Sequence, residues 1–271
     1  MVVKGMRIFS LCCLIVGIAL VSVFGAEQST LDRIVAGGVL RVGMAASEPA
    51  QFYDINTGKW EGFMVEFWKS LGTEMDVTVQ FVETSWDLFL LALTSDQFDV
   101  FGASTFYRPQ RALKVNFSTP LFYKGEAIVA RADDARFNTL ADVEAVAGVR
   151  IGCLLGAVEE ISVPKWFPDA EMVTFTAPSD IDVAPALNSG MIDLWCTDEA
   201  VARFWLKENP WGKIVGIFGG HPISVAVRFG DYDWLNFIDA YIGYVRTSGD
   251  LAMWMEQFGE SGDMIWPAQQ P

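Results

Sequence analysis

Short apolar runs alternate with amphipathic segments along most of the chain. The segments expected to form strands are 39–43, 77–82, 98–101, 126–131, 149–153, 172–176, 191–198 and 222–228. The segments expected to form helices are 29–36, 63–71, 86–93, 140–143, 184–190, 232–249 and 251–258. This alternation of a period of two with a period near 3.6 predicts an α/β fold with mostly parallel sheets.

Polar residues with useful chemistry follow several of these strands. The stretch 99–123 runs from a buried strand through small residues, including Ser104, to a polar segment that contains Arg111. Gly156 follows the predicted strand 149–153 after a short interval, and Asp198 is at the C-terminal end of the predicted strand 191–198. Ligands of parallel α/β sheets bind at the carboxyl ends of the strands, so these residues are expected to meet in one cleft. Hydroxyl groups and an arginine fork suit a carboxylate, although Asp198 also suits a helix cap.

Composition and charge narrow the class of protein. The chain has 271 residues, 52% of them hydrophobic, which is enough for two modest domains. Its 34 acidic and 19 basic residues give a formal net charge of −15, which disfavours binding to nucleic acid. The single histidine, His221, argues against a histidine metal site and against serine–histidine catalysis. No cofactor or metal is expected.

The N-terminus has the pattern of a secretory signal. Lys4 and Arg7 precede an apolar run over 8–24, and small residues follow at Gly25 and Ala26. This predicts a signal peptide at 1–25, removed on export, with a retained membrane anchor as the alternative. Export would place the mature chain in an oxidising compartment, where Cys153 and Cys196 form either a disulfide or two buried free thiols.

Several motifs, in the same order along the chain, resemble the extracellular solute-binding proteins that serve ABC importers of polar amino acids. The stretch 115–121, Val-Asn-Phe-Ser-Thr-Pro-Leu, is similar to the family pattern that follows the ligand arginine. Segments 62–66, 154–160 and 191–198 resemble other family motifs. The resemblance covers residues from about 31 to 258. Val158 and Phe106 depart from it, since the family more often has a threonine and a small polar residue there.

The resemblance implies a two-lobed type II periplasmic-binding-protein fold, with each lobe a mostly parallel sheet flanked by helices. One lobe is expected to comprise 26–122 and 232–271, and the other 126–222. Two hinge crossings are expected, near 123–125 and 223–231. The implied protein is a periplasmic monomer whose partners are a small zwitterionic ligand, a polar or basic amino acid, and a membrane ABC permease.

The resemblance also implies a set of ligand-binding residues. Arg111, Ser104 and the N–H groups near Gly156 are expected to hold a carboxylate, and Asp198 an ammonium group. The remaining expected site residues are Glu159, Phe52, Trp86, Phe106, Val158 and Glu48. Trp86 has a core position as its alternative, and Glu48 a solvated loop position.

Two other functions fit the same resemblance. Periplasmic cyclohexadienyl dehydratases resemble these receptors and need an acid, for which Asp198, Glu159 or Glu48 are candidates. A receptor that presents its ligand to a membrane sensor is the third reading. A transport receptor without enzymatic activity is the leading hypothesis.

Overall fold

The computed structural model describes residues 28–260, and the expected signal peptide at 1–25 lies outside them. The helices are α1 (Thr30–Gly37), α2 (Phe63–Glu74), α3 (Phe89–Thr94), α4 (Pro109–Ala112), α5 (Leu140–Glu144), α6 (Glu159–Trp166), the 3₁₀ helix η1 (Asp180–Val183), α7 (Ala184–Asn188), α8 (Glu199–Leu206), α9 (Tyr232–Ser248) and α10 (Asp250–Gln257). The strands are β1 (Val39–Met44), β2 (Phe52–Asp54), β3 (Lys59–Glu61), β4 (Thr78–Glu83), β5 (Val100–Phe106), β6 (Val115–Phe117), β7 (Phe122–Arg131), β8 (Arg150–Leu154), β9 (Glu171–Phe175), β10 (Leu194–Asp198) and β11 (Gly212–Arg228).

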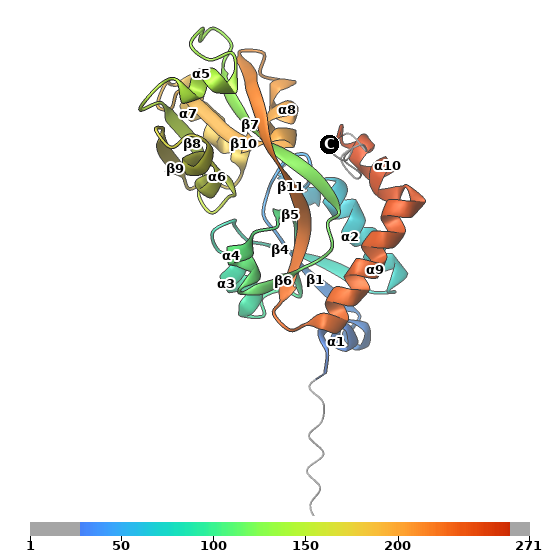
Figure 1. Cartoon of the computed structure of the whole chain (residues 1–271). Coiled ribbons are helices and arrows are strands. Elements are labelled where there is room, and N and C mark those ends of the chain that lie inside the picture. Colours follow the sequence, from blue (N-terminus) through green and yellow to red (C-terminus); the bar gives the residue numbers. More distant parts are fainter. Residues whose placement is uncertain (1–27, 261–271) are drawn as a thin grey trace, which may run out of the picture.

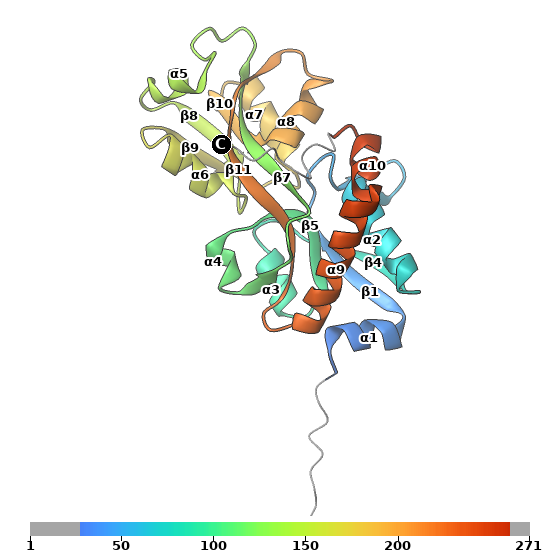
Figure 2. The same ribbon diagram turned by 45° about the vertical axis from the view of Figure 1, so that its right-hand side comes forward.

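The elements form two lobes, which Figures 1 and 2 show one above the other. Lobe 1 contains β1 to β6, α1 to α4, α9 and α10, and lobe 2 contains α5 to α8, η1 and β8 to β10. This is the α/β, two-lobed architecture expected from the sequence. None of the helices within residues 28–260 has the length and apolarity needed to span a bilayer.

One nine-stranded sheet runs through both lobes in the order β4-β1-β5-β11-β7-β10-β8-β9, with β6 also paired to β11. The strands β4, β1 and β5 are mutually parallel in lobe 1, as are β10, β8 and β9 in lobe 2. Between them, β7 and β11 form an antiparallel ribbon that crosses from one lobe to the other. The expected hinge crossings at 123–125 and 223–231 fall within this ribbon or directly beside it.

The strand β11 has 17 residues, although the sequence pattern indicates a strand only from 222 onward. Its pairing with β7 shifts register twice, between Ile214 and Gly216 and between Phe218 and His221. Gly219 lies in the second shift with a φ of +73°, a conformation that glycine adopts without strain. These bulges allow one strand to continue through a glycine-rich segment that would otherwise indicate a turn.

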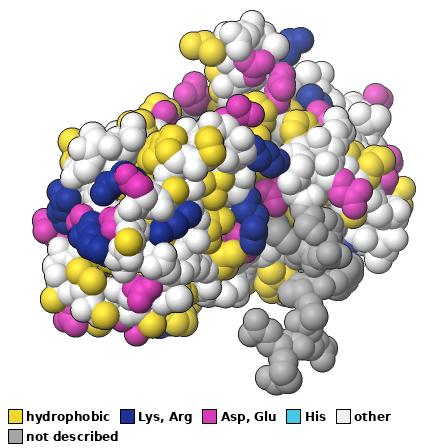
Figure 3. All heavy atoms as spheres, turned by 90° about the horizontal axis from the view of Figure 1, so that it is seen from above, with side chains coloured by type: hydrophobic (Ala, Val, Ile, Leu, Met, Phe, Trp, Pro, Cys, Tyr) yellow, Lys and Arg dark blue, Asp and Glu magenta, His cyan; other side chains and the backbone are white. Residues whose placement is uncertain are grey.

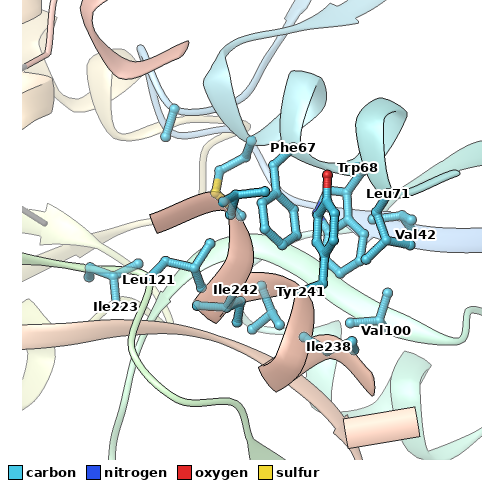
Figure 4. Close-up of a cluster of buried hydrophobic side chains, with 14 of the residues drawn as sticks. Val42, Phe67, Trp68, Leu71, Val100, Leu121, Ile223, Ile238, Tyr241 and Ile242 are labelled. Atoms are coloured by element: carbon cyan, nitrogen blue, oxygen red, sulfur yellow. The ribbon is translucent and has the colours of Figure 1, made fainter. Parts of the chain in front are cut away.

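Each lobe has a buried apolar core beside the sheet. In lobe 1, side chains from α2 and α9 pack over β1 and β5, with Phe67 and Tyr241 ring to ring at 5.2 Å (Figure 4). In lobe 2, helices α5 and α6 cover one face, with Phe137, Ile151 and Cys196 among the buried residues. Cys196 and Cys153 lie on the paired strands β10 and β8 as buried free thiols. Each core fixes the strand ends from which the site is built.

Candidate functional site

A cavity lies between the lobes at the carboxyl ends of their parallel strands. Its lining comes from both lobes and consists of Ser47, Trp86, Ser104, Phe106, Arg111, Ala157, Val158, Glu159, Asp180 and Asp198. Seven of these residues, namely Trp86, Ser104, Phe106, Arg111, Val158, Glu159 and Asp198, are expected site residues.

Arg111 supplies a buried positive charge without a carboxylate partner. It lies on the short helix α4 of lobe 1 and is 6% exposed. Its Nη2 donates to the Gly156 carbonyl at 2.6 Å, and its guanidinium lies 4.9 Å from the centre of the Phe89 ring. Burial, reinforced by the nearby charge of Arg108, lowers the pKa of Arg111 to about 9. Within residues 28–260 no ion pair offsets the cost of burying the Arg111 charge, so a bound anion would be stabilised here.

Ser104 lies beside this arginine, on β5. It is 2% exposed, and its hydroxyl has no hydrogen-bond partner among the described residues. A buried hydroxyl without a partner costs free energy, which a bound acceptor would recover. Ser104 and Arg111 therefore offer two kinds of donor to one anionic group in the same cavity.

Asp198 ends β10 and has two partners at once. Its Oδ1 accepts from the Ala200 N–H at 2.8 Å, which caps helix α8, and its Oδ2 lies 2.9 Å from Lys124 Nζ. Burial raises the pKa of Asp198, and the Lys124 charge opposes that change. Asp198 therefore takes the cap position considered for it and also lines the cavity, where its binding of a ligand stays a prediction. Lys124 was not predicted, although a lysine in the buried strand β7 is a signal for such a pair.

Glu159 and Asp180 add two further carboxyl groups to the cavity. Glu159 is the first residue of α6, is 2% exposed, and has no hydrogen-bond partner for its Oε2 among the described residues. Burial first, and then the charge of Asp180, raise the pKa of Glu159 well above its usual range. Burial and the charge of Asp198 raise the pKa of Asp180 to about 8. Asp180 lies in the 3₁₀ helix η1, a segment without periodic pattern, and sequence reasoning missed it.

Two acids near the cavity already have partners. Glu126, next but one to Lys124 on β7, has one carboxylate oxygen 3.0 Å from His221 Nε2 and accepts from the Ser162 hydroxyl with the other. Glu48 does not line the cavity; it accepts a hydrogen bond from Ser179 Oγ at 2.5 Å, across the lobes. Burial raises the pKa of Glu48. The solvated position considered for Glu48 is not the observed one.

The apolar walls are only partly those expected. Trp86, Phe106 and Val158 line the cavity, and Trp86 is fixed by donating its Nε1–H to the Ala46 carbonyl at 3.0 Å. Phe52 lies instead in strand β2, which pairs with β3 in a separate two-stranded hairpin, and it is half-buried outside the cavity lining. Trp86 is therefore a wall of the cavity rather than only a core residue.

Gly156 also lies outside the cavity lining. Its N–H donates to Glu160 Oε2 at 2.9 Å, so the expected donation of this group to a ligand carboxylate is not available in this arrangement. The glycine has a φ of +82°, and a Cβ there would lie 2.7 Å from the Asp87 nitrogen of the opposite lobe. Because Gly156 has no side chain, the two lobes can approach each other here, and its carbonyl accepts a hydrogen bond from Arg111.

Comparison with known proteins gives a consistent group of relatives. Residues 40–261 match the sequence model of the bacterial extracellular solute-binding proteins, family 3. The L-cystine-binding protein TcyJ of Escherichia coli (strain K12) is 26% identical over 236 residues, covering 86% of this chain and 87% of that protein. The cyclohexadienyl dehydratase of Pseudomonas aeruginosa is 25% identical over 247 residues, covering 89% of each.

Solved structures agree with these sequence relatives. The ancestral amino acid-binding protein AncCDT-1, a precursor of cyclohexadienyl dehydratase, superposes with a TM-score of 0.78 at 31% identity, covering 85% of this chain and 99% of that one. The P235GK mutant of the protein ArgBP from T. maritima has a TM-score of 0.76 at 29% identity, covering 84% of this chain and 98% of that one.

Proposed function

The chain belongs to the bacterial extracellular solute-binding proteins of family 3, and from that premise we propose that it captures an amino acid between its lobes and delivers it to a membrane ABC permease. Its relatives named as binding proteins for amino acids support this transport function. The proposal includes export through the signal peptide at 1–25 to the periplasm and action as a monomer. An acidic chain with both signs of charge intermingled on the face seen in Figure 3 suits a free receptor.

The observation that carries the proposal is the arrangement of opposite charges in one cavity. Arg111 is a buried cation without an ion-pair partner in the described part of the chain, and Asp198 is a buried acid on the other lobe. A zwitterionic ligand can pair with both residues. Its carboxylate would bind Arg111 and the Ser104 hydroxyl, and its ammonium group would bind Asp198. Trp86 and Phe106 would enclose its carbon skeleton. Because the ligand bridges the lobes, it binds the closed form more tightly and shifts the population toward it.

The test is a thermal-shift and calorimetric screen of the mature protein with the common amino acids. We expect at least one L-amino acid to raise the melting temperature, since a ligand that binds only the folded state stabilises it. The matched control is the corresponding amine that lacks the carboxylate, which should give no shift because it has no group for Arg111. Absence of binding by every amino acid would overturn the proposal.

A second candidate function is that of a cyclohexadienyl dehydratase. The observation that favours it is Glu159, which is buried, has an Oε2 without a partner, and has a raised pKa, as a general acid requires. The dehydratase relative adds to this support. Incubation with prephenate or arogenate decides between the two: product formation that is lost in Glu159→Gln would establish the enzyme, whereas amino-acid binding without turnover supports the receptor.

A further inference from the structure

The carboxyl groups of the cavity outnumber the cations available to them. Glu159, Asp180 and Asp198 line the cavity, and only Asp198 has an ion-pair partner, Lys124, among the described residues. In the proposed function, the ligand carboxylate pairs with Arg111 and the ligand ammonium pairs with Asp198. After these pairs are made, two buried carboxyl groups, Glu159 and Asp180, still have no cation among the described residues that would favour their ionised forms.

The two carboxyl groups without a cation, Glu159 and Asp180, both line the cavity. Glu159 Oε2 is buried without a hydrogen-bond partner in the described structure, and the negative charge of Asp180 acts on Glu159 more strongly than that of Glu126 or Asp198. Other acids close by are already engaged, Glu126 by His221 and Ser162, and Glu48 by Ser179. Among the acids that line the cavity, Glu159 therefore has an unused acceptor, and Asp180 is the lining acid that acts on it most strongly.

We propose that Glu159 and Asp180 form a subsite for a second cationic group of the ligand, and that this group displaces a proton that the pair holds when the cavity is empty. The inference rests on the proposed function and names its ligand class, an amino acid with a cationic side chain. On binding, the carboxylic O–H bond of the pair breaks, its proton passes to solvent, and a carboxylate remains opposite the ligand cation. No covalent bond of the ligand changes.

The surroundings of the pair determine the direction of the pH dependence. The charged and titratable groups that act on Glu159 or Asp180 come from α4 and the residue before it, from β7, β8 and β10, and from the 45–51 loop. They are Glu48, Arg108, Arg111, Lys124, Glu126, Cys153, Cys196 and Asp198, and Glu160 follows Glu159 on α6. Burial is the largest influence on both carboxyl groups and favours their protonated forms. Removing the proton becomes easier as the pH rises, so a cationic ligand should bind more tightly at higher pH.

The experiment compares lysine, ornithine and arginine with glutamine in isothermal titration calorimetry. Measurements at one pH in two buffers of different ionisation enthalpy give the number of protons released. We expect the cationic amino acids to bind at least tenfold more tightly than glutamine and to release about one proton each. Their affinity should rise with pH up to about 8, by at most about tenfold per unit, whereas that for glutamine should not.

Two variants locate the effect. Glu159→Gln should abolish proton release and reduce the preference for cationic amino acids over glutamine. Glu160→Gln is the matched control, because its neighbouring carboxylate bonds the Gly156 N–H instead of lining the cavity. Equal or tighter binding of glutamine, or cationic binding without proton release, would overturn the subsite and leave the receptor function intact. Failure of every amino acid to bind would overturn both.

Discussion

Replacement of Arg111 by methionine separates binding from stability, because the buried guanidinium has no carboxylate partner in the described structure. Truncation of one member of a desolvated charge pair costs about 2–5 kcal/mol. At about 1.4 kcal/mol for each factor of ten, ligand affinity should fall from roughly 30-fold to several thousand-fold. The empty protein should respond in the opposite direction, since burial, reinforced by the charge of Arg108, lowers the pKa of Arg111 to about 9.

The gain in stability can be worked out from the same contacts. A pKa change from 12.5 to about 9 corresponds to roughly 3–5 kcal/mol of burial cost at about 1.36 kcal/mol per unit. Loss of the hydrogen bonds to the Gly156 and Phe106 carbonyls costs about 1 kcal/mol each, which offsets part of this gain. The empty Arg111→Met protein should therefore be about 1–3 kcal/mol more stable, which raises the melting temperature by roughly 2–4 °C per kcal/mol for a chain of this size.

The assay is calorimetric titration together with thermal unfolding of the empty and saturated protein. Arg108→Met is the matched control, because Arg108 donates to the Ala157 carbonyl at 3.1 Å without lining the cavity. It should lose less than about tenfold in affinity. Wild-type affinity in Arg111→Met would refute the assignment of Arg111 as the carboxylate-binding residue. A lower melting temperature of the empty variant would refute the claim that the unpaired charge of Arg111 destabilises the empty protein.

Three further outcomes are expected. Lys124→Met should destabilise the fold by about 3–5 kcal/mol in urea unfolding, because it leaves Asp198 buried without its cation. Adding Asp198→Asn should recover part of that loss, and additive effects of the two substitutions on the free energy of unfolding would contradict the pairing. Gly156→Ala should hold the lobes apart, since its Cβ would meet the opposite lobe at 2.7 Å; a ligand-induced decrease in the radius of gyration equal to that of the wild type in X-ray scattering would refute this. Because the folded-state pKa of Asp180 is raised from 3.8 to about 8, the folded chain binds more protons than the unfolded one, and the stability of the empty protein should fall as the pH rises from about 4 to 8. Asp180→Asn should flatten that slope in thermal unfolding, and an unchanged slope would count against the assignment.

Residues that follow regular strands were the predictable part of the site. Asp198 ends β10, Ser104 lies two residues before the end of β5, and Glu159 follows β8 after a short turn, so parallel topology brings them to one edge. The family resemblance supplied Arg111, whose helix has only four residues and has no periodic signal of its own. Strand order and motif order therefore predict most of the residues that line the cavity.

The rest of the site depends on tertiary contacts that local patterns do not encode. Asp180 reaches the cavity only because η1 packs beside β8, and Lys124 is buried only because β7 continues between the lobes. Phe52 was misplaced because its alternating neighbours form a separate hairpin with β3. The early part of β11 was missed because Gly216, Gly219 and Gly220 resemble turn residues in a local window.

The ribbon of β7 and β11 limits how this protein can diverge. Side chains alternate along a strand, so Lys124 and Glu126 point to the same side, where they meet Asp198 and Ser162. Insertion or deletion of a single residue ahead of them would turn both to the other side of the sheet and remove the charges behind the cavity. New ligand preferences can arise by exchange of side chains at this ribbon, whereas a change in its length by one residue would disrupt the site and the passage between the lobes together.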